Sequence, residues 1–176
     1  MLINPQITNI ALALLLMLAV ITDMKSRKIP NLLLGIGIVA AFAWNFYFQG
    51  LGGLLFSLKG FGVGIVLLVV PFILGGMGSG DVKLLGMIGA FRGSSYALST
   101  FIWMALIGGV LAMFYLIKEG QLQTTFNRLG RGMVNAVKLQ QTSAFLNSTN
   151  KKEFKIYFPY GVAIALGALA AHWKSW

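Results

Sequence analysis

Residues 7–31 of the chain read ITNIALALLLMLAVIT-DMKSRKIPN, an uncharged apolar run followed at once by charged and turn-forming residues. A helix that crosses a bilayer needs roughly 20 predominantly apolar residues, and this run is apolar over most of that length. A cleavable signal peptide carries its basic residues before the apolar part, whereas here the charges follow it. We therefore predict that Ile7 to Thr22 belongs to a first membrane helix that is retained.

The composition of the whole chain agrees with this prediction. Of 176 residues, 57% are hydrophobic and only 10% are charged, against roughly 25% charged in an ordinary soluble domain. This composition argues strongly against a soluble enzyme. The chain has no cysteine and one histidine, which argues against thiol nucleophiles, His-based triads and metal cages, so we expect no cofactor and no metal. The net charge of +10 indicates which side of a bilayer the loops face rather than nucleic-acid binding.

Five further apolar segments follow the first, at residues 31–48, 54–74, 82–91, 96–117 and 156–173. The predicted fold is an all-α membrane protein of about six transmembrane helices, forming one integral-membrane domain over residues 1–176. The second segment ends in an aromatic cluster that is typical of a membrane interface. Within the segments, we expect close helix packing at Gly60, Gly64, Gly86 and Gly89.

The segment Val82 to Phe91 is shorter than a bilayer requires, and the basic residues decide whether it crosses. If it crosses, eleven basic residues lie on one side, and only Lys59, Arg92 and Lys174 lie on the other. If it does not, the basic loop 118–155 moves to the opposite face and the positive-inside rule fails. We therefore predict a short, tilted or bilayer-thinning fourth helix, with both termini outside.

The cytoplasmic loop at 118–155 has a helical pattern of its own. Its apolar residues recur every three or four positions at Leu122, Phe126, Leu129, Met133 and Val137, and its basic residues follow another face. This pattern predicts a basic amphipathic helix between the fifth and sixth spans, suited to anionic lipid at the cytoplasmic surface. The alternative is a helix that packs on the transmembrane bundle.

Two of the four acidic residues, Asp23 and Asp81, stand at helix ends against the apolar region. Two spans separate them, so they return to the same face of the bilayer. Ionisable groups at such positions are costly and usually functional. The alternatives are a helix-end anchor for Asp23, neutralised by Lys25 or Arg27, and a helix N-cap for Asp81. Glu119 and Glu153 have basic neighbours and are expected to be solvated loop charges.

Two carboxyls that meet at low dielectric hold one proton between them, because repulsion and desolvation raise one pKa. The ionised member can take a proton from water. The protonated member can hydrogen-bond a peptide carbonyl and later help to protonate the leaving amine. Peptide hydrolysis by this route needs no metal, cysteine or histidine.

Glycines precede Asp81 at Gly76, Gly78 and Gly80. They would let a substrate backbone approach closely and let the loop adopt positive φ; the alternative is a plain turn between helices. Lys83 is a candidate contact for an acidic group of the substrate, or it holds down the pKa of the carboxyl pair. Its alternative role is to snorkel to the membrane surface.

Two strings of residues together resemble the signature motifs of the type IV prepilin peptidases, which are membrane aspartyl proteases. They are Asp23 followed after five residues by Ile29-Pro30-Asn31, and GMGSGDVKL at 76–84. The resemblance implies that Asp23 and Asp81 are the catalytic pair. It also implies that the substrate is a prepilin-like membrane protein whose basic leader is cut after a glycine, at the cytoplasmic face of the inner membrane.

Other features of the family match this chain less completely. Pro159-Tyr160-Gly161 resembles a third, weaker feature, but Val162 stands where relatives often carry proline, so we assign the last helix no catalytic role. Many bacterial relatives carry a preceding cytoplasmic region with paired Cys-x-x-Cys motifs that N-methylates the product. This chain begins at its first helix, so we expect a peptidase-only form, similar to those serving Flp/Tad pili or archaeal filaments, without methyltransferase activity.

Two other functions remain open. A small proton- or ion-coupled transporter would use Asp23 and Asp81 as carriers, and it predicts acids near the bilayer middle and inverted repeats. A membrane assembly subunit would recruit partners through the basic loop, and it predicts that neither Asp matters to activity.

Overall fold

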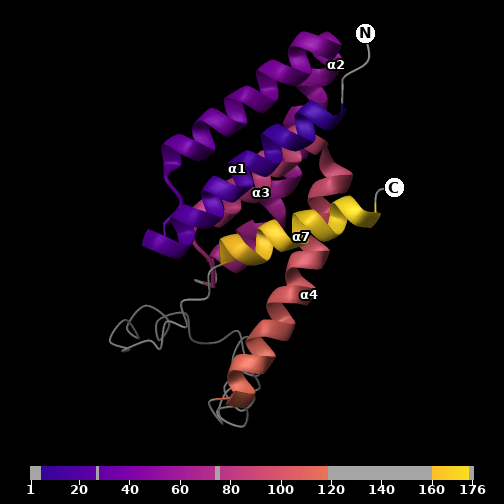
Figure 1. The fold of residues 1–176 in the computed structure, drawn as a ribbon. Coiled ribbons are helices and arrows are strands. Elements are labelled where there is room, and N and C mark those ends of the chain that lie inside the picture. Colours follow the sequence, from indigo (N-terminus) through magenta and orange to yellow (C-terminus); the bar gives the residue numbers. More distant parts are fainter. Residues whose placement is uncertain (1–4, 27, 74–75, 119–159, 175–176) are drawn as a thin grey trace, which may run out of the picture. The chain divides into compact units, whose positions relative to one another are not determined.

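The computed structural model describes residues 5–26, 28–73, 76–118 and 160–174. The regular secondary structure of these residues is helical throughout (Figure 1), so the all-α prediction is confirmed for the described part of the chain. The helices are α1 (Pro5–Ser26), α2 (Asn31–Ile73), α3 (Ser79–Arg92), α4 (Ser94–Lys118) and α7 (Tyr160–Lys174). The predicted amphipathic helix of the loop, together with Glu119 and Glu153, lies outside the described residues.

The chain divides into two compact units. The first consists of Met1–Gly108 and Phe158–Trp176, and the second of Gly109–Tyr157. In the second unit, the described residues are 109–118, which continue α4. The first unit contains both aspartates.

Helix α2 is interrupted near its middle. Its 43 residues would extend about 65 Å as one straight helix, twice the hydrocarbon thickness of roughly 30 Å. Gly50 has φ 60° and ψ −143°, a left-handed conformation that glycine adopts without steric cost. A Cβ on Gly53 would collide with the carbonyl oxygen of Asn45, although eight residues of straight helix span about 12 Å. The chain therefore reverses here, at the predicted boundary between the second and third apolar segments, and Figure 1 shows the two arms.

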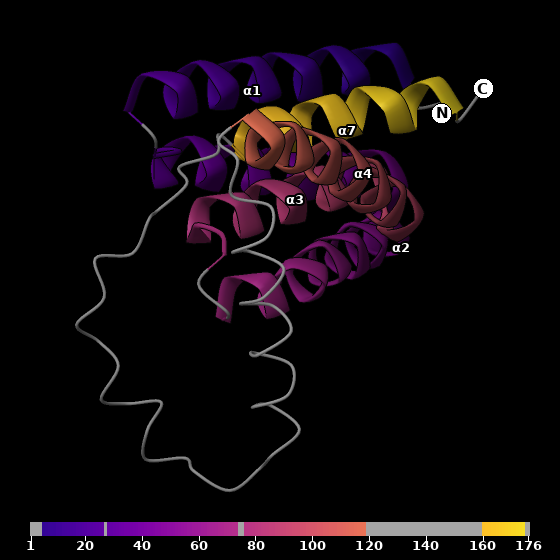
Figure 2. The ribbon, with the colours of Figure 1, turned by 90° about the horizontal axis from the view of Figure 1, so that it is seen from below.

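Helix α3 is the centre of this unit, and every residue from Val82 to Phe91 except Lys83 is buried. Seen from below, α3 lies between α1 and one arm of α2 (Figure 2). Its 14 residues rise only about 21 Å. Because neighbouring helices cover it, α3 does not have to match the length of lipid chains.

Close glycine contacts join α3 to the second arm of α2. A Cβ on Gly60 would overlap the carbonyl of Gly89, and a Cβ on Gly89 would overlap the carbonyl of Gly60. One turn further on, a Cβ on Gly64 would lie 2.8 Å from the Cα of Gly86. The predicted close packing of these four glycines is confirmed, and it follows the small-residue pattern of membrane helix pairs.

The outer helices carry large apolar side chains on their exposed faces. On α1 these recur with helical spacing and are at least 39% exposed: Ile7, Ile10, Leu14, Met17, Leu18, Ile21 and Met24. Exposed apolar faces of this extent are typical of proteins that contact lipid or partners rather than water alone. By length and composition, α1 and α2 could each cross a membrane.

Candidate active site

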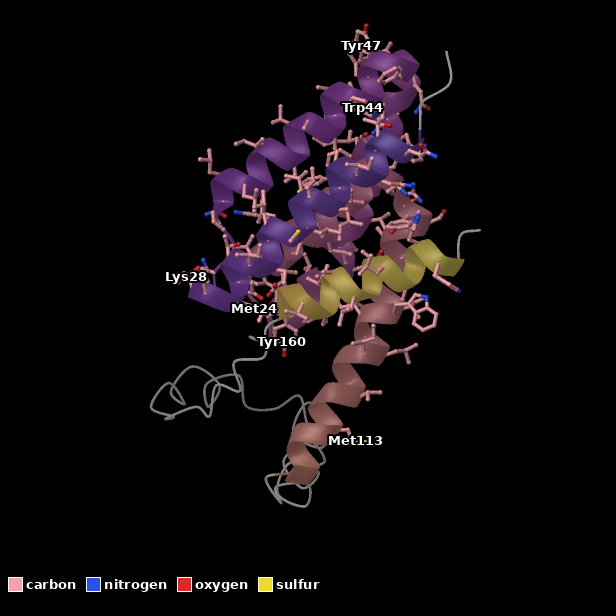
Figure 3. The ribbon with its side chains drawn as sticks, viewed as in Figure 1. Met24, Lys28, Trp44, Tyr47, Met113 and Tyr160 are labelled. Carbon is pink, nitrogen blue, oxygen red and sulfur yellow. The ribbon has the colours of Figure 1, made fainter. Side chains whose placement is uncertain are left out.

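Asp23 and Asp81 occupy helix ends on one side of the unit. Asp23 lies in the last turns of α1, and Asp81 lies in the first turn of α3. Each is only 8% exposed. Figure 3 shows Met24, the neighbour of Asp23 in sequence, at the same end of the unit as Tyr160, with Trp44 and Tyr47 at the opposite end. The structure therefore brings the two predicted carboxyls to one end, as the count of spans predicts.

The carboxyl of Asp81 closes the beginning of α3 from within the first turn. Its Oδ2 accepts a hydrogen bond from the Gly78 N–H at 3.1 Å, and its own N–H donates to the Gly78 carbonyl at 3.2 Å. The N-cap position belongs to Gly78, because α3 begins two residues before Asp81. The alternative in which Asp81 is itself the N-cap is therefore wrong in position.

Asp81 lies just before the apolar segment 82–91. The pKa of its carboxyl is higher than is usual for an aspartate. Burial raises its pKa to about 6, the Gly78 N–H opposes this rise, and the negative charge of Asp23 adds to it. A charge acts on a neighbouring pKa mainly over a few ångströms. The charge of Asp23 therefore contributes to the raised pKa of Asp81, while burial raises the pKa of Asp23 itself and the Gly161 N–H opposes that rise.

Asp23 is held by the first turn of α7. The Gly161 N–H donates a hydrogen bond to Asp23 Oδ2 at 3.1 Å, and the N-terminal end of a helix favours a negative charge. A Cβ on Gly161 would lie 2.7 Å from the same oxygen, so only glycine fits without displacing the carboxylate. The last helix, to which the sequence assigned no catalytic role, therefore supplies a backbone donor to Asp23. A glycine at the start of a helix is the sequence signal that could have indicated this contact.

The two motifs also meet beyond the aspartates. Lys83 Nζ donates a hydrogen bond to Asn31 Oδ1 at 2.9 Å, and a Cβ on Gly80 would lie 3.4 Å from the Cβ of Ile29. Ile29 and Asn31 end the first motif, while Gly80 and Lys83 belong to the second. Lys83 thus joins the two motifs through an amide, a role that the sequence did not predict. This exposed bond is weak, so it leaves the ammonium available for other contacts.

The glycines before Asp81 have ordinary backbone conformations. Gly78 is extended, with φ −82° and ψ 154°, and the described residues with positive φ are Gly50 and Gly93. The expectation of positive φ at Gly76, Gly78 or Gly80 is therefore wrong, because α3 begins directly after an extended Gly78. A Cβ on any of these three would lie no closer than 3.4 Å to its neighbours, an ordinary contact.

The family of the chain follows from comparison with known proteins. The model of the type IV leader peptidase family matches residues 10–113, more than half of the chain and the part that contains both aspartates. The chain belongs to this family. The resemblance drawn from the two motifs is thereby confirmed. Members of this family are membrane-embedded, and the family implies that the chain is a protease of the prepilin-peptidase type. No curated protein and no solved structure was found to match it.

The titratable side chains of the site are suited to acid–base chemistry. Among the described residues, no group of three or more His, Cys, Asp or Glu side chains is placed to hold a metal ion. The site consists of two coupled carboxyls, two backbone N–H donors and a nearby lysine. One carboxyl that titrates near neutral pH beside a second carboxyl can both donate and accept a proton.

Proposed function

We propose that this leader peptidase is an aspartyl endopeptidase that removes the basic leader of prepilin-like membrane proteins after a glycine, with Asp23 and Asp81 as the catalytic pair. The observation that supports this most directly is that both carboxyls are buried at one end of the unit, where burial raises the pKa of Asp81 to about 6 and the charge of Asp23 adds to the rise. A proton resides on Asp81 at and below about pH 6, beside the second carboxyl. This is the protonation state that water activation requires.

The geometry favours one division of roles. Each carboxyl accepts one backbone N–H, and burial raises both pKa values, that of Asp81 to about 6. We therefore assign Asp81 as the protonated member and Asp23 as the ionised member that takes a proton from water. The water oxygen attacks the carbonyl carbon of the glycine, while protonated Asp81 donates a hydrogen bond to the carbonyl oxygen. The C–N bond then breaks and the leaving nitrogen takes a proton from the pair. The products are a leader with a new carboxylate and a mature protein with a new amino terminus.

The glycines and Lys83 are proposed to contact the substrate. Gly76 and Gly78 are exposed beside Asp81, and an extended peptide can approach them closely because they lack side chains. Packing leaves room for a methyl group at Gly80, so a requirement for glycine there would come from the substrate. Lys83 is proposed to attract an acidic group in the mature part of the substrate.

We also propose the predicted topology for the chain. Residues 1–176 form one integral-membrane peptidase domain with six spans, both termini outside and the active site at the cytoplasmic face of the inner membrane. The eleven-to-three division of basic residues supports this orientation. The burial of α3 supports a short fourth span, because other helices rather than lipid surround it. The basic loop at 118–155 is proposed to lie on anionic lipid.

The decisive experiment compares leader removal from a tagged prepilin-like protein by the wild type, Asp23→Asn and Asp81→Asn. Each variant loses one proton-transfer group, so we expect the cleavage rate to fall at least about 100-fold. Glu119→Gln is the matched control, since it removes a carboxylate from the loop, and its rate is expected to stay within about twofold. In the same panel, Gly80→Ala is expected to raise KM more than it lowers kcat.

Two outcomes would contradict the proposal. Full processing by either Asn variant, at a protein level equal to the wild type, would exclude that aspartate from catalysis. Equal loss of activity in Glu119→Gln would show that the assay responds to net charge or expression rather than to the pair. If the protein were instead an ion-coupled transporter, the wild type would not process any prepilin-like protein.

A further inference from the structure

A cavity of about 830 Å³ opens at the end of the first unit opposite the aspartates. Thr8 of α1, Asn45 of α2 and Arg92 of α3 line it, together with Tyr96 and Ile102 of α4. Its volume is in the range of sites that bind small molecules. The proposed peptidase mechanism does not use it.

Arg92 is the cationic side chain in the wall of this cavity. Its guanidinium lies 4.7 Å from the centre of the Tyr96 ring and donates a hydrogen bond to Asn9. The Tyr96 hydroxyl donates to the Ala168 carbonyl at 2.7 Å, which fixes the ring beneath the guanidinium. Arginine carries five N–H donors, so several remain for a ligand. Their fork geometry suits a phosphate.

The charge of Arg92 has no carboxylate partner in the described part of the chain. The acids described are Asp23 and Asp81. Asp81 stands at the other end of α3, about 16 Å away along the helix axis, and Asp23 lies about 21 Å along α1 from the Asn9 that binds Arg92. Within the described part of the chain, this half-buried cation therefore has no counter-charge, and an anionic ligand could supply one.

A second polar group in the cavity wall lacks a partner. Thr8 is only 6% exposed, and its hydroxyl has no hydrogen-bond partner in the structure. A buried hydroxyl without a partner is costly, and a ligand oxygen would remove this cost. The neighbouring wall is already satisfied, because Asn45 Nδ2 donates to the carbonyls of Ala41 and Ala90 at 3.1 and 3.2 Å.

The remaining wall is apolar and continues to the outside of α4. Ile102 and Leu106 line the cavity and are also 50% and 57% exposed, so the cavity is continuous with the apolar outer face. A small soluble anion bound to Arg92 would make no contact with this apolar wall. From these contacts we propose that the cavity binds the phosphate and the upper acyl chain of an anionic phospholipid, taken from the leaflet opposite the aspartates.

The test measures lipid binding to the full-length protein in detergent by native mass spectrometry. The probes are phosphatidylglycerol, phosphatidylcholine with the same acyl chains, and inorganic phosphate. We expect phosphatidylglycerol to bind roughly tenfold more tightly than phosphatidylcholine, and Arg92→Gln to remove this preference. Lys59→Gln is the matched control, because it removes the same charge from an exposed position of α2 outside the cavity, and its affinities are expected to stay within about twofold.

A second variant keeps the proposal testable if Arg92→Gln does not fold. Thr8→Val keeps the shape of the side chain and removes a hydroxyl that bonds to no other residue, so the fold is retained and phosphatidylglycerol affinity is expected to fall about threefold. Equal losses in Arg92→Gln and Lys59→Gln would overturn the site in favour of general surface charge. Competition by inorganic phosphate at equal concentration would overturn the lipid assignment, as would equal affinity for the two lipids.

Discussion

Replacing Gly161 by alanine tests the link between α7 and Asp23 with a single methyl group. The added Cβ would lie 2.7 Å from Asp23 Oδ2 and 3.2 Å from its Cγ. The backbone N–H that binds this oxygen is unchanged, and alanine favours a helix more than glycine does. The substitution therefore displaces the carboxylate without removing its donor or weakening α7.

The size of the expected effect follows from this distance. To regain an ordinary contact of 3.4 Å, the oxygen has to move by about 0.7 Å, and a displacement of about 1 Å in a catalytic group can cost roughly 100-fold in rate. We therefore expect kcat for leader removal to fall between about 10-fold and 100-fold. KM is expected to change little, because Gly161 contacts Asp23 rather than the proposed substrate glycines.

The assay uses purified protein in lipid vesicles with a prepilin-like substrate, and it measures kcat and KM together with thermal unfolding. Gly35→Ala is the matched control: it makes the same change in a helix where no atom lies within 4 Å of the added Cβ. Its kcat is expected to stay within about twofold of the wild type. If Gly161→Ala unfolds normally and keeps the wild-type kcat, α7 does not position a catalytic Asp23.

Two other predictions concern the pair and the helix that carries it. Asp81 is expected to be half-protonated at about pH 6 and protonated below this pH. The measurement follows the infrared band of its protonated carboxyl, which is identified by its loss in Asp81→Asn. Asp23→Asn is expected to lower this midpoint because it removes a neighbouring charge, and an unchanged midpoint would contradict the coupling. Gly60→Val is expected to lower the free energy of unfolding by about 1–3 kcal/mol, because its side chain overlaps the Gly89 backbone. Gly62→Ala on the same helix, with nothing within 4 Å, is expected to unfold like the wild type, and equal destabilisation would refute the close contact.

Much of the fold could be predicted because apolar length and glycine placement are visible in the sequence. The run Ile7 to Thr22 lies within α1, and the four glycines predicted to pack closely do so. The reversal in α2 was placed between residues 48 and 54. The residue that makes it could not be chosen among several glycines, because a left-handed φ depends on how the two arms pack.

The site was predictable only as far as side chains reveal it. The number of spans between Asp23 and Asp81 predicted that both lie at one end, because an even number of crossings returns a chain to the same face. The contact of Gly161 with Asp23 had only a weak signal, a glycine at the start of a helix, because its donor is a backbone N–H that every residue except proline carries. The bond between Lys83 and Asn31 depends on the register of two helices, which no local pattern contains.

The burial of α3 between Val82 and Phe91 has a consequence for how the protein responds to membrane thickness. Hydrophobic mismatch between a protein and its bilayer acts on helices that touch lipid, which tilt or shift to accommodate it. The exposed apolar face of α1 is open to this force, whereas α3 is enclosed by protein from Val82 to Phe91 apart from Lys83. Asp81 therefore sits on a part of the molecule that is insulated from membrane thickness.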